Sequence, residues 1–187
     1  LSRKTYAPVA DGSEEVISFG ATGDALGKAV RRYEAGKLAS ETLYAPGGLA
    51  QSTEEYSYDS RGRRISRVVV PASGYGTASE YVYDGDVLVR TIVRDSSGKV
   101  LRRFEITVTG GLPAREDEFD GAGNPVSSVR RKFVGGRLSR EERLNASGAL
   151  LSAYEYDRDE SGNAVGTRYL DRDGNLLETV RTTWARF

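Results

Sequence analysis

Glycines recur at intervals of 25 residues along most of this chain, and this spacing constrains its fold more than any other feature. The glycines in this register are Gly23, Gly48, Gly98, Gly123 and Gly148, with Gly74 and Gly174 each one residue out of step. Aromatic residues keep the same period at Tyr33, Tyr58, Tyr83 and Phe133. Because two independent markers share one period, the sequence predicts seven copies of one small structural unit.

Each repeat contains two kinds of turn. One is a short glycine turn, as in Glu34–Lys37 and Gly135–Arg137. The other has Asp or Asn at its first position and Gly at its fourth, as in Asp59–Gly62, Asp95–Gly98 and Asn145–Gly148. The Asp or Asn side chain bonds to the backbone two residues later, and Gly supplies the positive φ that closes the bend. These are the turns of antiparallel hairpins.

The runs between these turns are rich in β-branched and aromatic residues, as in Val100–Val108. The sequence therefore predicts an all-β fold, an antiparallel meander of about 13–14 strands in seven 25-residue hairpin repeats. Only Asp24–Glu34 can also be read as a short capped helix, but Gly27 and its phase in the repeat favour a strand. No linker or low-complexity tract divides the chain, so we expect one domain over residues 1–187.

The predicted strands carry charges on both faces. In Val100–Val108, Arg102 lies on one face, while Arg103 and Glu105 lie on the other. A thick core requires one clearly apolar face, which several of these strands lack. Because long sheets twist, we expect a curled single sheet that closes or nearly closes into a wide barrel or half-pipe. The alternative is an extended single-layer ribbon.

The composition excludes several classes of function. Lys plus Arg and Asp plus Glu each number 27, and without a cationic excess no nucleic-acid partner is expected. The chain has no Cys and no His, which removes disulfides, thiolate metal sites and the Ser-His-Asp and Cys-His catalytic arrangements. We therefore expect a protein that is not an enzyme and has no cofactor.

Met is absent as well, even at position 1, which is Leu1. We expect either a removed secretory signal or lipoprotein leader, or a trimmed start. The longest apolar stretches, such as Val68–Ala72, have the length of strands, so no transmembrane helix is predicted.

Three segments share a sharper pattern of an aromatic residue, any residue, Tyr and Asp: Tyr56–Asp59, Tyr81–Asp84 and Tyr154–Asp157. With Gly62 and Arg63 after the first, this pattern resembles the YD repeats of bacterial Rhs-type proteins and teneurins. Tyr33–Tyr44 is also similar to MORN-type hairpin repeats. The YD resemblance implies curled β-sheet strips that form shells around toxins or serve in adhesion. It implies a scaffold or interaction surface, located outside the cytoplasm in the periplasm or at the cell surface.

Asp157, Asp159 and Ser161 match the opening of a calcium-binding loop, in which oxygen ligands occupy alternating positions. The acidic residue expected at the twelfth position of such a loop is Arg168 here, so the motif is incomplete. The alternative, which we favour, is an exposed turn.

Six tyrosines are candidates for a binding surface: Tyr56, Tyr58, Tyr81, Tyr83, Tyr154 and Tyr156. Members of each pair lie on alternate positions of one strand face, where they could stack on a peptide or a glycan. The alternative, which we favour, is cross-strand aromatic packing that fixes the strand register.

Paired carboxylates such as Glu54 and Glu55 are adjacent in the chain, so they point to opposite faces of a strand and cannot flank one glycosidic bond. We therefore expect a non-enzymatic structural or protein-interaction scaffold at the bacterial cell envelope, with a protein or an envelope component as its partner. The alternative function is a small-ligand-binding barrel with a partly polar lumen.

Overall fold

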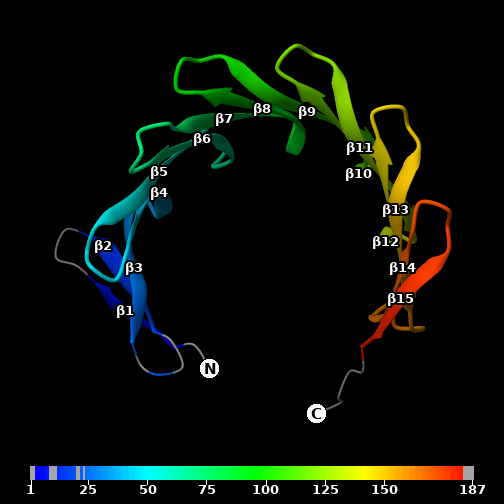
Figure 1. Cartoon of the computed structure of the whole chain (residues 1–187), viewed down its shortest axis with the longest axis horizontal. Helices are drawn as coiled ribbons and strands as arrows, with labels where there is room; N and C mark the ends of the chain where they lie inside the picture. The colour runs from blue at the N-terminus through cyan, green and yellow to red at the C-terminus, as the bar shows by residue number, and fades with distance from the viewer. Residues whose placement is uncertain (1–2, 9–11, 20–21, 23, 183–187) are drawn as a thin grey trace. The chain divides into compact units, whose positions relative to one another are not determined.

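A computed structural model of the chain describes residues 3–8, 12–19, 22 and 24–182. Its strands form one fifteen-stranded antiparallel sheet, in which each strand pairs with its neighbours in sequence (Figure 1). The strands are β1 (Arg3–Pro8), β2 (Ser13–Phe19), β3 (Ala25–Glu34), β4 (Lys37–Tyr44), β5 (Ala50–Tyr58), β6 (Arg64–Pro71), β7 (Thr77–Asp84), β8 (Val87–Asp95), β9 (Val100–Thr109), β10 (Leu112–Asp120), β11 (Pro125–Val134), β12 (Arg137–Asn145), β13 (Leu150–Arg158), β14 (Ala164–Leu170) and β15 (Leu176–Arg181).

The all-β meander is confirmed, with fifteen strands where thirteen or fourteen were predicted. The count differs because β1 and β2 precede Gly23, the first glycine of the register. The segment Asp24–Glu34 contains strand β3, so the helical alternative is wrong. None of the described segments forms a helix with the length and apolarity of a membrane span.

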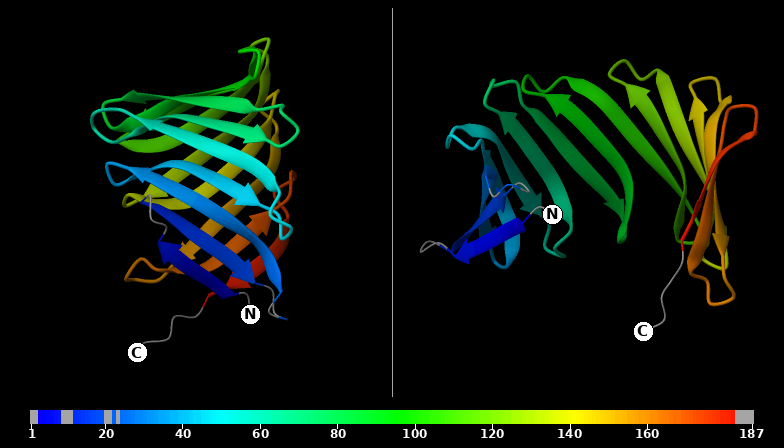
Figure 2. Two further views of the ribbon diagram at one scale, coloured as in Figure 1. Left: turned by 90° about the vertical axis from the view of Figure 1, so that its left-hand side faces the viewer. Right: turned by 60° about the horizontal axis from the view of Figure 1, so that its bottom comes forward.

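The strand order begins at β1 and ends at β15, and each of these two strands has one neighbour among the described strands. The sheet is therefore an open meander that does not close into a barrel. The Cα positions cluster into two compact units, one of Leu1–Val82 with Ile92–Leu101 and one of Tyr83–Thr91 with Arg102–Phe187. Within each unit the sheet is twisted and curled, with one concave face (Figure 2). One domain over residues 1–187 stays a prediction.

The four-residue turns have the chemistry predicted for them. The Oδ1 atom of Asp120 accepts hydrogen bonds from the backbone N–H groups of Ala122 (2.9 Å) and Asn124 (2.8 Å). Gly123 has a φ of 88° and donates its N–H to the Asp120 carbonyl at 3.0 Å. The same i to i+3 backbone bond closes five further turns that begin with Asp or Asn: Asp59–Gly62, Asp95–Gly98, Asn145–Gly148, Asp159–Gly162 and Asp171–Gly174.

Very few side chains are fully buried. The buried hydrophobic residues among the described ones are Val16, Ala29, Leu144, Ala153 and Leu170. In the described strands of each unit, contacts join sequence neighbours only, so no second layer covers either face of the sheet. Stability therefore depends on the backbone ladders and on the cross-strand side-chain pairs of each face.

Candidate functional site

The concave face of the first unit carries a row of charged side chains across five strands. This charged row consists of Glu14, Arg31, Glu41, Glu54 and Arg67, from β2 to β6 in order. The register places Arg31 directly opposite Glu14 and Glu41, and it places Glu41 opposite Glu54. Residues that are paired in register point to the same face of a sheet, so these side chains share one surface.

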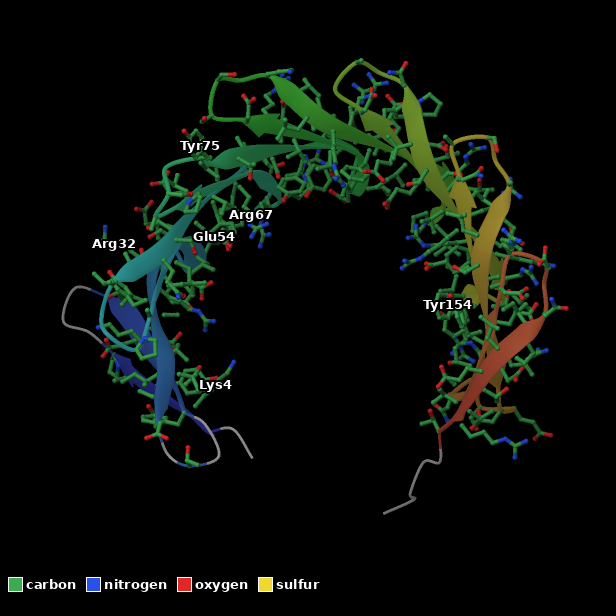
Figure 3. The ribbon with its side chains drawn as sticks, in the orientation of Figure 1. Lys4, Arg32, Glu54, Arg67, Tyr75 and Tyr154 are labelled. Carbon is green, nitrogen blue, oxygen red and sulfur yellow. The ribbon has the colours of Figure 1, made fainter. Side chains whose placement is uncertain are left out.

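The side chains of Glu54 and Arg67 lie on the inner side of the curve in this unit, as Lys4 does, while Arg32 lies on the opposite side (Figure 3). The placement follows from strand alternation, since Arg32 is adjacent to Arg31 in β3 and therefore points the other way.

Each carboxylate in the middle of the charged row has its own arginine. Arg31 donates from Nε to Glu41 Oε1 at 2.7 Å, and its Nη1 lies 3.6 Å from Glu14 Oε2. Arg67 donates two bonds to Glu54, from Nε at 2.8 Å and from Nη2 at 2.6 Å. The side chains of Glu41 and Glu54 are 17% and 15% exposed, so the two arginines offset a like-charge pair that is largely shielded from water.

Tyr56 completes this cluster. Its hydroxyl donates to Glu54 Oε2 at 2.5 Å, and the Arg64 guanidinium lies 4.7 Å from the centre of its ring. Burial raises the pKa of Tyr56 to about 12, and the hydrogen bond to Glu54 contributes in the same direction. The Arg67 hydrogen bonds hold the pKa of Glu54 below its ordinary value. A general acid requires a raised carboxyl pKa, whereas the pKa of Glu54 is lowered.

Tyr58 has a local structural contact. Its hydroxyl donates to the Leu38 carbonyl at 2.9 Å, and Lys37 Nζ lies 5.4 Å from its ring centre. Tyr58 therefore links β5 to β4, and the Arg64 contact links Tyr56 to β6, while a tyrosine binding surface stays a prediction.

The second unit repeats part of this arrangement with residue numbers higher by 100. Arg131 in β11 donates from Nε to Glu141 in β12 at 2.9 Å, as Arg31 does to Glu41. Tyr154 takes the position of Glu54 opposite the glutamate. The second unit therefore carries a tyrosine at the position where the first unit has the carboxylate of Glu54.

This substitution creates a tyrosine cluster on the second unit, made of Tyr154, Tyr156 and Tyr169. Tyr154 lies on the concave side of this unit, and its ring centre is 5.0 Å from that of Tyr169 on β14 (Figure 3). Burial raises the pKa of Tyr156, and the negative charge of Glu141 acts in the same direction. Tyr154 and Tyr169 are opposite each other in register. A hairpin centred on the turn Asp159–Gly162 would instead align Tyr154 with Thr167, so the sequence analysis did not identify this pairing, which the register shift between Asp157 and Arg158 produces.

The structure distributes the six predicted tyrosines over both units. Tyr81 and Tyr83 are both half-buried on β7, with Tyr81 in the first unit and Tyr83 in the second. Tyr56 and Tyr58 belong to the first unit, whereas Tyr154 and Tyr156 belong to the second. Each unit therefore presents its own set of tyrosines.

The residues of the calcium hypothesis take part in turn and strand contacts. Asp159 Oδ1 accepts from the Asn163 N–H at 2.8 Å, and its Oδ2 accepts from Asn163 Nδ2 at 3.2 Å. Asp157 Oδ1 accepts from Arg168 at 3.1 Å, and the Ser161 carbonyl accepts from Arg137 at 3.3 Å. Within the described part of the chain, no three acidic side chains gather in a way that could hold a metal ion. Calcium binding by these residues stays a prediction.

The concave face of the first unit also contains a groove of about 350 Å³, whose lining includes Lys4, Val16, Gly27, Ala29, Leu43 and Gln51. Gly27 has a φ of 146°, and a Cβ at this position would lie 2.7 Å from the Tyr44 carbonyl oxygen. Only glycine allows β3 and β4 to approach this closely here. The charged side chains of Lys28, Arg31 and Glu41 also line this groove, so a molecule that fits it would be largely polar with an apolar part.

No protein-family model and no curated protein matches this sequence. Solved structures that align with more than four-fifths of the chain include the following three. A porin-like protein from Bacteroides uniformis ATCC 8492 is 12% identical, with a TM-score of 0.35, over 95% of this chain and 92% of its own. The TcdB2-TccC3-TEV structure is 12% identical, with a TM-score of 0.22, over 88% of this chain and 12% of its own. A protein of unknown function from Bacteroides fragilis NCTC 9343 is 13% identical, with a TM-score of 0.18, over 81% and 88%. These similarities are too weak to assign a function.

Proposed function

We propose that this chain is a non-enzymatic scaffold that binds protein partners. The observation that carries this proposal is that the part of the charged row that recurs in the second unit is an ion pair between two strands. The Arg31–Glu41 pair recurs as Arg131–Glu141, whereas the neighbouring carboxylate Glu54 is replaced by Tyr154. A catalytic pair needs both carboxylates at the site where it acts. An ion pair between two strands needs only one arginine and one glutamate. The uncovered faces of each unit are available for contacts.

The carboxylates that are best placed for catalysis are Glu41 and Glu54, which share one face. Both are bound by arginines, and the pKa of Glu54 is lowered, which supports a structural role for the pair. The test is hydrolysis of a panel of chromogenic glycosides and esters by the wild type, Glu41→Gln and Glu54→Gln, with the exposed Glu80→Gln as matched control. We expect no rate above the blank for any of the four proteins. Hydrolysis that is lost in Glu41→Gln or Glu54→Gln and kept in Glu80→Gln contradicts the proposal.

The resemblance to YD repeats supports a scaffold at the bacterial cell envelope, outside the cytoplasm. In the segment that carries this resemblance most clearly, Tyr58 bonds to Leu38 on the adjacent strand β4, and Asp59 accepts from the Arg63 N–H within the turn. Fractionation of the source cells, followed by protease treatment of intact cells and spheroplasts, tests the location. Recovery of the protein only from the protease-protected cytoplasmic fraction contradicts it.

A second candidate function is binding of a small molecule in the groove of the first unit. The lumen predicted for a closed barrel is absent because the described sheet is open, so the groove takes its place in this alternative. Native mass spectrometry of gently purified protein tests it, with Gln51→Trp to fill the groove from an exposed position. A ligand retained by the wild type and lost from Gln51→Trp supports this function, and the absence of any retained ligand contradicts it.

A further inference from the structure

The face of the second unit opposite its concave face carries a small hollow over strands β11 and β12. The hollow has a volume of about 280 Å³, which is the size of a site for one small group. The side chains that line it on this face are Arg130, Lys132, Arg140 and Glu142.

The register assigns these side chains to this face. Arg131 also borders the hollow, but its side chain pairs with Glu141, which lies opposite Tyr154 in register. Tyr154 lies on the concave side of the unit (Figure 3). Arg130 and Lys132 are the chain neighbours of Arg131, so their side chains point to the other face.

The positive side chains of the hollow outnumber the carboxylate that lines it. Arg140 donates from Nε to Glu142 Oε1 at 2.9 Å, and Arg130 Nη1 lies 3.4 Å from Glu142 Oε2. Outside the lining, Glu155 divides its charge between Arg140 and Arg168. The lining itself has three positive side chains and one negative side chain, so its formal net charge is +2.

Lys132 is the cation of the hollow that the sheet leaves without a counter-charge. Its side chain is exposed and has no ion pair among the described residues. The register places it directly opposite Arg140, so two positive charges face each other across β11 and β12. Like charges in this arrangement destabilise a sheet, and an anion bound between them removes that cost.

The first unit shows that the fold does not require these charges. Strands β3 and β4 pair in the same register as β11 and β12, with residue numbers lower by 100. There Arg32 lies opposite Ser40, and Val30 lies opposite Thr42. Uncharged residues therefore occupy three of the four equivalent positions, and no like-charge pair is formed. Charges that break a pairing rule without a structural need indicate a function for the residues that carry them.

We propose that the hollow over β11 and β12 binds a phosphate group, held by Lys132, Arg130 and Arg140. A phosphate monoester carries a charge of about −1.5 to −2 at neutral pH, which matches the net charge of the lining. Ammonium and guanidinium groups form strong, charge-assisted hydrogen bonds to phosphate oxygens. This site goes beyond the proposed scaffold function and does not depend on it.

The three cations differ in how far they are already positioned. Arg140 is held by Glu142 and Glu155, so its guanidinium is fixed before the ligand arrives. Arg130 is 56% exposed and its contact with Glu142 is long, so it can turn toward a ligand. Lys132 breaks no ion pair with a described residue when it binds.

The experiment titrates the full chain, labelled with nitrogen-15, at neutral pH and constant ionic strength. The probes are inorganic phosphate, phenyl phosphate and acetate. Binding is followed by chemical-shift changes at the amides of residues 130–132 and 140–142. The amides of residues 30–32 and 40–42 are the internal control, because the same register there lacks the cluster.

Two substitutions remove the same charge at different places. Lys132→Gln alters the hollow, whereas Lys99→Gln alters an exposed lysine of the first unit. We expect inorganic phosphate to bind Lys132→Gln about tenfold more weakly than the wild type, because one charge-assisted bond is lost. Lys99→Gln should bind as the wild type does. Acetate should bind the wild type more weakly than phosphate, since it carries a single charge.

The two phosphate probes distinguish the sources of the ligand. Tighter binding of phenyl phosphate identifies a phosphate ester, and equal or weaker binding identifies the free anion; both results support the site. The absence of shift changes, equal changes at both sets of amides, or equal affinities of Lys132→Gln and Lys99→Gln each overturns it. Acetate that binds as tightly as phosphate overturns the assignment to phosphate. None of these results affects the scaffold function, which the hydrolysis assays test separately.

Discussion

Arg31 donates from Nε to Glu41 Oε1 across 2.7 Å, joining β3 to β4 on the concave face of the first unit. A hundred residues later, Arg131 and Glu141 form the same bond at 2.9 Å between β11 and β12. Both arginines also approach a second carboxylate, Glu14 at 3.6 Å and Glu116 at 3.9 Å. With so few buried side chains, such half-buried pairs are a main source of specificity for strand register in this sheet.

The bidentate pair of Arg67 and Glu54 should contribute measurably to stability. Arg67→Ala removes two charge-assisted hydrogen bonds and leaves Glu54 opposite Glu41 without its counter-charge, so we expect a loss of about 1–2 kcal/mol in the free energy of unfolding. The control is Arg102→Ala, whose side chain is 64% exposed and whose pair with Glu118 should contribute less than about 0.5 kcal/mol. Urea denaturation at neutral pH measures both, and equal losses would contradict this prediction.

The turn carboxylates should make stability depend on acid pH. Hydrogen bonds from the Asn124 side chain and backbone hold the pKa of Asp120 below its ordinary value. A depressed folded-state pKa means that the stabilisation is present above the unfolded value of about 4 and is lost as the pH falls below it. Asp120→Asn keeps an Oδ1 acceptor, as Asn145 does naturally, and should show a smaller loss of stability on acidification than the wild type. Asp120→Ala lacks the acceptor and should be the less stable variant at neutral pH, as thermal melts can show.

The phenol of Tyr56 should ionise well above the ordinary pH range of a tyrosine. Its pKa of about 12 predicts an ionisation step well above the ordinary value of about 10. Because the folded-state pKa is raised, the stabilisation is complete below the unfolded value and is lost as the pH rises through the folded one. A spectrophotometric titration of phenolate absorbance measures this, and Tyr56→Phe should remove the step near pH 12. Persistence of the step in Tyr56→Phe would assign it to another tyrosine.

Two glycines with different surroundings should respond differently to alanine. At Gly27, a Cβ would lie 2.7 Å from the Tyr44 carbonyl oxygen, and the φ of 146° is also unfavourable for alanine. We expect Gly27→Ala to destabilise the protein by more than about 2 kcal/mol. At Gly123 the φ is 88° but nothing lies within 4 Å of the added Cβ, so Gly123→Ala should cost only about 1–2 kcal/mol of backbone strain. Comparable melting temperatures for the two variants would contradict the close approach of β3 and β4.

The hairpin architecture follows from local chemistry and was therefore predictable. Asp120 and Gly123 determine their turn through bonds within five residues of chain, so the turn can be identified without knowledge of the rest of the fold. The same reasoning identified Asp24–Glu34 as a strand, because Gly27 breaks a helix and has the phase of the repeat. The alternation of charges along single strands correctly indicated a sheet without a thick core.

The pairing of side chains across strands was not predicted, because it depends on register shifts beside the turns. The shift between Leu43 and Tyr44 and the shift between Asp157 and Arg158 decide which residues become opposite. One such pairing brings Tyr154 against Tyr169, and another places Glu41 against Glu54. A sequence that is read strand by strand contains both residues of each pair but no information on their alignment.

The sequence by itself determined the kind of structural unit and its repetition, because turns and strand periodicity are encoded within about ten consecutive residues. Only the three-dimensional arrangement shows that the described sheet stays open, since its strand order runs from β1 to β15 without a pairing between these two strands. Closure depends on how twist and curl accumulate over many strands, and small differences at each strand pair add up over the whole sheet. No single residue carries that information.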